Sequence, residues 1–169
     1  WEEYSLLTEE ILASYEKLYV VKSISKSYGV PGFRLGILAS ANEALIAEMK
    51  KDVAIWNINS FGEFFMQIFE KYKKDYAKSL KKIKYARSIF EEELRQLPGV
   101  TVFPSQANYV MCELDGTMTS RELAEALLER NVFIKDLTSK VGNGKQYIRL
   151  AVRNEEENKY LIEQLKELL

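Results

Sequence analysis

The residues best suited to chemistry lie in one short segment, residues 23–36. Lys26 stands between two serines there, and Arg34 follows eight residues later among three glycines and a proline. Serine hydroxyls, closely approaching backbone N–H groups and a guanidinium fork are the groups that hold an anion. A lysine amine becomes nucleophilic when desolvation or a nearby cation tunes it. The segment therefore predicts an anion site with Lys26 as a candidate nucleophile.

Two short apolar stretches must position this segment. Residues 18–22 and 34–39 are β-branched, short and bounded by Gly, Pro and Ser, so we expect buried strands that bring Lys26 and Arg34 to one pocket. No Gly-Lys-Ser/Thr follows a Gly-x-x-x-x spacing, which excludes a P-loop. The glycines follow the lysine and lead into a strand rather than a helix, which excludes the dinucleotide-binding fingerprint.

The composition excludes several other classes of function. The chain has 169 residues and a net charge of −1 with no basic arm, which argues against nucleic acid as a partner. It contains no histidine, so histidine-based nucleophilic catalysis and histidine-ligated metal sites are excluded. The single cysteine, Cys112, excludes an internal disulfide, and we expect it to be a buried, inert thiol. No run of eighteen apolar residues occurs, so we expect no membrane association and a cytoplasmic setting.

The rest of the chain alternates between helical and strand patterns. Apolar spacing predicts one long helical region over residues 60–97, with a break near residues 73–75 because it is long for a single globular helix. Two capping boxes, at Ser40–Glu43 and Thr119–Glu122, predict helix starts, and Asn131 suits a left-handed C-cap. The other expected elements are helices over residues 4–16, 43–51, 119–130 and from 155 onward, and strands over residues 100–103, 107–113, 132–134 and 146–152.

Segment 23–36 resembles the cofactor-lysine signature of the fold-type I pyridoxal-phosphate (PLP) enzymes. It is most like the class I/II aminotransferases of the histidinol-phosphate aminotransferase-like group, whose pattern is Ser/Thr-x-Ser/Ala-Lys-x-x-Gly-x-x-Gly-x-Arg-x-Gly. Every fixed position of that pattern is present here. The resemblance implies PLP as the cofactor and Lys26 as the catalytic lysine that binds its aldehyde covalently. It also implies that Ser23 and Arg34 hold the cofactor phosphate, with Ser25 assisting.

A second candidate site surrounds Arg149. An unpaired guanidinium in an apolar strand is costly, so Arg149 either pairs with an internal carboxylate or awaits an anionic ligand. The family places its substrate-carboxylate arginine in a Tyr/Leu-x-Arg-Ile/Leu/Val setting, which this strand matches. The resemblance also implies that Asn108 and Asn59 lie near the substrate. Arg153 would share the face of Arg149 if the strand continued, although relatives often carry Gly-Thr there.

The resemblance implies an α/β fold, the C-terminal part of the PLP-dependent transferase fold. Residues 1–58 would be a remnant of the large PLP-binding domain, residues 59–97 long interdomain helices, and residues 98–169 a small α+β domain with a mostly antiparallel sheet. We expect this chain to be the C-terminal piece of a protein about twice as long or more. Residues that bind the cofactor ring would lie upstream, so the piece alone is expected to be inactive, and the full-length protein to be a homodimer.

The implied activity is amino transfer between an amino acid and a 2-oxo acid or a phosphorylated carbonyl substrate. A PLP-dependent decarboxylase or lyase of the same fold, such as a threonine-phosphate decarboxylase-like enzyme, is the alternative, because these residues do not determine which Cα bond breaks. A non-catalytic regulatory module with this fold is a further alternative. The intact lysine motif and the absence of a basic DNA-reading segment argue against the regulatory module.

Overall fold

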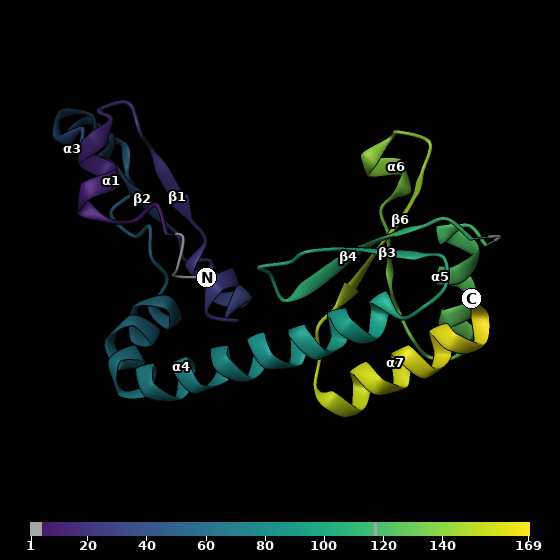
Figure 1. Ribbon diagram of the computed structural model, residues 1–169. Helices are drawn as coiled ribbons and strands as arrows, with labels where there is room; N and C mark the ends of the chain where they lie inside the picture. The colour runs from purple at the N-terminus through teal and green to yellow at the C-terminus, as the bar shows by residue number, and fades with distance from the viewer. Residues whose placement is uncertain (1–4, 117) are drawn as a thin grey trace. The chain divides into compact units, whose positions relative to one another are not determined.

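The computed structural model describes residues 5–116 and 118–169, and the chain divides into two compact units between Ala77 and Lys78. The boundary falls within a single long helix, α4 (Ser60–Arg95), so each unit contains one end of it (Figure 1). The expected break near residues 73–75 is wrong. No glycine or proline occurs between Gly62 and Pro98, so no residue type there interrupts the helical hydrogen bonds.

The first unit is built around a hairpin. Strands β1 (Val20–Lys22) and β2 (Ile37–Ala39) pair antiparallel, with Val20 opposite Ala39 and Lys22 opposite Ile37. Their connection is therefore segment 23–36, which contains two short helical turns. The helical elements of this unit, apart from its part of α4, are α1 (Glu9–Ser14), α2 (Ile24–Ser27), the 3₁₀ turn η1 (Pro31–Phe33) and α3 (Glu43–Asp52).

Several expectations for this unit need correction. The two strands are shorter than expected and are not buried, since Val21 is 78% and Ile37 45% exposed. The first helix begins only at Glu9, where the Thr8 hydroxyl accepts from Ile11 N; residue 4 of the expected range lies outside the described residues. Helix α3 begins after Asn42, whose side chain accepts from Leu45 N at 2.9 Å, so the capping box expected from Ser40 does not form. Instead, Asn42 N donates a hydrogen bond to the Ser40 hydroxyl, which fixes the backbone just before the helix.

The second unit is a four-stranded antiparallel sheet with helices on one face. The strand order is β3-β4-β6-β5, so the expected small antiparallel sheet is present. Its elements are β3 (Val100–Phe103), β4 (Tyr109–Leu114), α5 (Ser120–Glu129), β5 (Lys135–Asp136), α6 (Thr138–Val141), β6 (Gln146–Ala151) and α7 (Glu155–Leu168).

The turn that leaves α5 shifts one strand from its expected place. Asn131 is left-handed, with φ 61°, as its type and position predicted. Val132 N still donates to Leu127 O at 2.9 Å, so the chain is completing the helix end there. The strand expected over residues 132–134 is therefore wrong, and pairing with β6 begins only at Lys135. Val132 and Ile134 pack against the core without joining the sheet.

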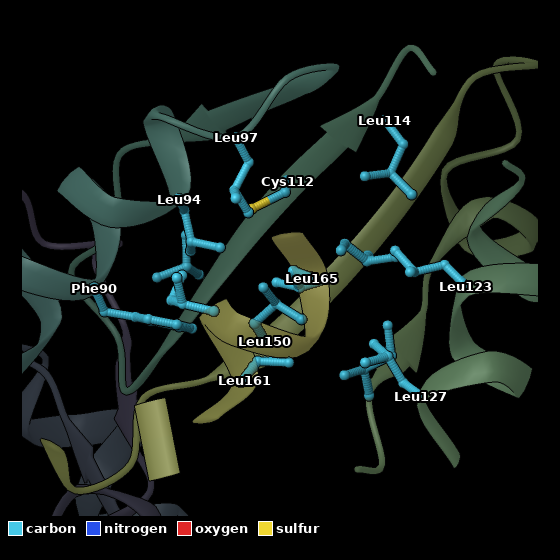
Figure 2. Packing of buried hydrophobic residues seen from close by; sticks show 14 residues of the cluster. Phe90, Leu94, Leu97, Cys112, Leu114, Leu123, Leu127, Leu150, Leu161 and Leu165 are labelled. Carbon is cyan, nitrogen blue, oxygen red and sulfur yellow. The ribbon is translucent and has the colours of Figure 1, made fainter. Parts of the chain in front are cut away.

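Alternation along β4 and β6 separates an apolar face from an open one. Cys112, Leu114 and Leu150 point toward the helices, where Figure 2 shows them against residues from α4, α5 and α7. Cys112 is fully buried, so the expectation of a buried thiol is confirmed, and burial raises the pKa of that thiol to about 12, which disfavours the reactive thiolate. The packed residues contributed by the helices include Phe90, Leu94, Leu123, Leu127, Leu161 and Leu165.

A polar cluster closes the sheet edge where β5 meets α5. Thr138 N and the hydroxyl of Ser120, a residue that is 1% exposed, each donate to Asp136 Oδ1 at 2.8 Å. The hydrogen bond from the Thr138 backbone, with smaller help from the Ser120 hydroxyl, lowers the pKa of the Asp136 carboxyl although partial burial acts in the opposite direction. The ionised carboxylate is therefore the form that stabilises this edge.

We expect the stabilisation by Asp136 to disappear in acid. Because its pKa is lower in the folded than in the unfolded chain, the contribution is complete above about pH 4 and is lost as the pH falls through the folded-state value. Asp136→Asn should lower the free energy of unfolding by about 1 kcal/mol at neutral pH, measured by urea unfolding. The difference from wild type should shrink as the solution is acidified.

Glu129→Gln is the matched control, since Glu129 is exposed and forms no ion pair with a described residue. It should change the free energy of unfolding by less than about 0.5 kcal/mol. A penalty for Asp136→Asn that stays constant with pH would show that the lost geometry, and not the charge, is responsible.

Candidate functional site

Ser25 closes segment 23–36 at its base. The residue is 2% exposed, and its Oγ accepts from Leu35 N at 2.6 Å and donates to Leu35 O at 3.3 Å. Ser25 N also donates to Leu35 O at 3.1 Å. Three hydrogen bonds to one residue ten positions away fix the two ends of the loop against each other. The Ser25 hydroxyl is therefore engaged within the loop.

Lys26 lies on the single-turn helix α2, just after β1, and its side chain is exposed. This differs from the expected position at the end of a buried strand, because β1 stops at Lys22 and the chain turns into a helix. Among residues 5–116 and 118–169, no group forms a hydrogen bond or an ion pair with the Lys26 amine. The amine is thus available to an outside group.

Ser23 and Arg34 also present donors. Ser23 is the N-cap of α2, but its hydroxyl makes no capping hydrogen bond. Arg34 is exposed and left-handed, with φ 55° and ψ 36°, and its Nη1 donates to Pro31 O at 3.3 Å. A non-glycine residue in this region costs about 1 kcal/mol or more, and such strain is concentrated at functional sites. Most of the guanidinium fork remains free for a ligand.

A cavity of about 450 Å³ opens beside this loop within the first unit. Ile24, Tyr28, Arg34 and Phe65 are among the residues that line it, and Lys26 is not. The sequence-based expectation placed Lys26 and Arg34 in the same pocket, and only Arg34 lines this one. Lys26, one position beyond the buried Ser25, points away from the packed side of the loop.

Asn59 fastens the loop to α4. Its Oδ1 accepts from Gly62 N at 2.9 Å, which caps the helix, and its Nδ2 donates to Phe33 O at 2.8 Å. A Cβ on Gly62 would lie 2.9 Å from Leu35 Cδ2, so a larger residue there would displace the Leu35 side chain. Tyr76 adds a further tie, because its hydroxyl donates to Ser27 O at 3.0 Å. The Asn59 amide thus holds the loop in place through both of its polar atoms.

Arg149 lies on the open face of the second unit's sheet. It is exposed, and its guanidinium carbon lies 5.1 Å from the centroid of the Tyr109 ring. The expected desolvation cost in an apolar strand therefore does not arise. A cation over an exposed aromatic ring is stabilised by about 0.5–1 kcal/mol. Within the described part of the chain, no carboxylate forms an ion pair with Arg149.

Lys135 is the cation that sequence reasoning missed. It lies directly opposite Arg149 in the β5–β6 register and is exposed. None of the described carboxylates pairs with it. Like charges directly opposite each other destabilise a sheet, and an anion bound between them would relieve the repulsion. The sequence does place a lysine directly after Val132-Phe-Ile134. The strand expected there ended at Ile134, one residue before Lys135, so Lys135 was not assigned to the sheet.

Glu113, an acidic residue on this face, is paired with a different cation. Glu113 Oε1 accepts from Lys145 Nζ at 2.6 Å, and this hydrogen bond lowers the pKa of the Glu113 carboxyl. Glu113 therefore does not neutralise Arg149. The open face carries Arg149 and Lys135 and the aromatic rings of Tyr109 and Phe103, which are 40% and 38% exposed. This combination suits an anionic organic ligand.

Asn108 and Arg153 take different places. Asn108 is exposed just before β4, where its backbone oxygen accepts from Val152 N at 2.9 Å, and its side-chain amide bonds to no described residue. Arg153 does not share the face of Arg149, because β6 ends at Ala151. Arg153 Nη2 instead donates to Glu157 Oε1 at 2.7 Å, which raises the pKa of Arg153. Arg153 is thus part of the start of α7.

Two other kinds of site are absent from residues 5–116 and 118–169. No group of three acidic, cysteine or histidine side chains is gathered there in a way that could hold a metal ion. None of the described helices combines the length and apolarity needed to cross a membrane.

Comparison with known proteins identifies the family. The model of "Aminotransferase class I and II" matches residues 5–165. The chain is 32% identical over 160 residues to CMP-5'-(3-aminopropyl)phosphonate synthase of Streptomyces rubellomurinus, covering 94% of this chain and 26% of that protein. It is 32% identical over 158 residues to the L-serine phosphate decarboxylase of Sulfurospirillum multivorans, covering 92% of this chain and 40% of that protein.

Among solved structures, the histidinol-phosphate aminotransferase of Clostridium acetobutylicum superposes with a TM-score of 0.84 at 28% identity. That match covers 93% of this chain and 47% of the solved one. The chain thus spans less than half the length of each of these relatives. The family model covers nearly all of the chain, and the fold of the relatives extends beyond it. The chain belongs to the aminotransferase class I and II family.

Proposed function

We propose that the protein containing this chain is a PLP-dependent enzyme that transfers an amino group from an amino acid to a 2-oxo acid or a phosphorylated carbonyl substrate. The observation that carries the proposal is the free amine of Lys26 on a loop that Ser25 closes and that also presents Ser23 and Arg34. Membership in the aminotransferase class I and II family supports it. PLP, when bound, supplies an electron sink for negative charge at the substrate Cα.

The residues of the loop would divide the work. The Lys26 amine would bind the cofactor aldehyde covalently and, once released, would move the proton at the substrate Cα. The Ser23 hydroxyl and the Arg34 guanidinium would bind the cofactor phosphate, because the Ser23 hydroxyl makes no capping bond and Arg34 uses only Nη1 within the described residues. Ser25 would support that site through the closure of the loop rather than by direct contact. Asn59 would hold the loop against α4.

The open sheet face would bind the substrate's acidic groups. Arg149 offers two parallel donors to a carboxylate, which fixes the orientation of the substrate. Lys135 would add a second positive charge for a substrate that carries a further anionic group, such as a phosphate. The free amide of Asn108 would supply a neutral donor at the same edge. This assignment explains why two unpaired cations lie next to each other.

A decarboxylase is the second candidate, and one observation favours it. A relative at 32% identity is named L-serine phosphate decarboxylase, and a substrate of that kind carries a carboxylate and a phosphate. If Arg149 and Lys135 together held the phosphate, the carboxylate would be free to leave from Cα. If Arg149 held the carboxylate, that group would be retained and amino transfer would follow.

The test is to identify the products formed by the complete protein with PLP. ¹⁵N-labelled amino acids, including O-phosphoserine and O-phosphothreonine, would be supplied with and without a 2-oxo acid. We expect ¹⁵N to appear in the acceptor only when the 2-oxo acid is present, without release of CO₂. Release of CO₂ in proportion to substrate, independent of the acceptor, would establish the decarboxylase. A protein that neither binds PLP nor changes any substrate would refute both.

A further inference from the structure

We propose that Arg87 and Glu91 of α4 are positioning residues for the substrate-anion site, the part of the open sheet face where Arg149 would bind the substrate's acidic group. They would act through the loop of residues 104–108. They would hold that loop so that the Tyr109 ring lies against Arg149. The inference rests on the proposed role of Arg149 in binding the substrate's acidic group. It adds two residues, from a helix that forms no part of the sheet, to the determinants of that site.

Arg87 and Glu91 direct their polar atoms at the loop backbone. Arg87 is 8% exposed, and its Nη1 donates to Ala107 O at 2.8 Å. The Glu91 side chain is 12% exposed, and its Oε1 accepts from Ser105 N at 3.2 Å. Arg87 Nε and Glu91 Oε1 lie 3.8 Å apart, and Glu91 Oε2 also accepts from Arg95 Nη2 at 3.0 Å, so two guanidinium groups share the Glu91 carboxylate. Two neighbouring side chains of α4 therefore hold two points of the loop.

The loop passes this constraint directly to the site. The Ser105 hydroxyl accepts from Ala107 N at 3.0 Å and donates to Tyr109 O, which makes residues 105–109 one hydrogen-bonded turn. The next residue after Ala107 is Asn108, whose backbone oxygen accepts from Val152 N. Tyr109 then opens β4 and carries the ring that faces the Arg149 guanidinium at 5.1 Å. Only Asn108 separates the held Ala107 carbonyl from the residue that carries the ring.

The energetics favour a role in specifying conformation rather than in adding stability. Buried ion pairs recover their desolvation cost only with good geometry and further hydrogen bonds, and apolar residues of similar size are often as stable. The same stretch of α4 carries Phe90 and Leu94, which pack fully into the core. An apolar residue at position 87 would suit that environment but could not hold Ala107 O. The pair is therefore best explained by the loop that it fixes.

The test measures steady-state kinetics in the complete protein for Arg87→Met, which keeps the bulk of the side chain and removes its donors. We expect KM for an acidic substrate to rise about 10-fold, with kcat and PLP affinity nearly unchanged. Arg87→Lys, which can still donate to Ala107 O, should recover part of the loss. Arg121→Met is the control, because Arg121 is exposed and, among the residues that the structure describes, pairs only with Glu125 on its own helix; it should leave KM unchanged.

A second variant tests whether Arg87 acts through the Tyr109 ring. It also keeps the proposal testable if Arg87→Met fails to fold. Tyr109→Leu should raise KM to a similar extent, and adding Arg87→Met to it should raise KM little further. Fluorotyrosine at position 109 should show a changed ¹⁹F resonance in Arg87→Met and an unchanged one in Arg121→Met. Equal effects of Arg87→Met with and without Tyr109 would overturn the inference, as would an unchanged KM in both single variants.

The failure of this inference can be told apart from failure of the proposed function. If Arg149→Met raises KM while Arg87→Met and Tyr109→Leu do not, the site stands and the positioning role is wrong. If Arg149→Met leaves KM unchanged, the proposed role of Arg149 is wrong and the inference falls with it.

Discussion

Replacing Lys26 by alanine in the complete protein is expected to lower turnover by about 1,000-fold or more, because the same amine would anchor the cofactor and move the Cα proton. The structure motivates this expectation, since no described residue occupies the Lys26 amine. The direct measurement is borohydride reduction of the PLP-loaded protein followed by peptide mass mapping. We expect a pyridoxyl group on the peptide that contains Lys26, and none in the alanine variant.

Lys50→Ala is the matched control for this experiment. Lys50 is exposed on α3 in the same unit and forms no hydrogen bond or ion pair with segment 23–36. The variant should retain full activity and the labelled Lys26 peptide. A pyridoxyl label on another lysine, or turnover that survives in Lys26→Ala, would refute the assignment of the catalytic lysine.

Replacing Arg149 by methionine is expected to raise KM for a substrate with an α-carboxylate by roughly 30-fold, corresponding to about 2 kcal/mol for hydrogen bonds to a charged group. Arg149→Lys should recover only part of this, because an ammonium keeps the charge and loses the bidentate fork. Lys135→Met should matter mainly for substrates with a second anionic group. The measurement is KM and kcat for matched substrates with and without a phosphate.

Lys140→Met is the control for the two cation variants, since Lys140 is exposed on α6 and lies outside the sheet. It should leave KM unchanged for both substrates. If Arg149→Met raises KM only for phosphorylated substrates, Arg149 binds the phosphate. The proposed decarboxylase would then fit the site better than the aminotransferase.

Local features of the sequence were sufficient where a helix end is built from neighbouring side chains. The capping box of Thr119 and Glu122 and the left-handed Asn131 both form as predicted. The small antiparallel sheet that the family resemblance implied is also present. At the helix ends, the partners lie within a few positions of each other along the chain.

Features that depend on distant partners could not be predicted from pattern alone. The Ser25 hydroxyl is engaged by Leu35, ten residues away, and no local signal indicates that pairing. The exposure of β1 was missed because apolar composition does not reveal which elements cover a strand. Lys135 was missed because the end of α5 delays the strand by a few residues. We predicted a break in α4 because of its length alone, although its sequence contains no residue that interrupts a helix there.

The lone thiol gives the molecule a built-in probe of unfolding. Cys112 is the sole cysteine in the sequence and is sealed in the core of the second unit. Its rate of alkylation therefore reports how often that unit opens, while opening of the first unit goes unrecorded. The stability of the second unit, which carries the substrate-anion site, can thus be followed separately from that of the first unit, which carries the lysine loop, without introducing a label.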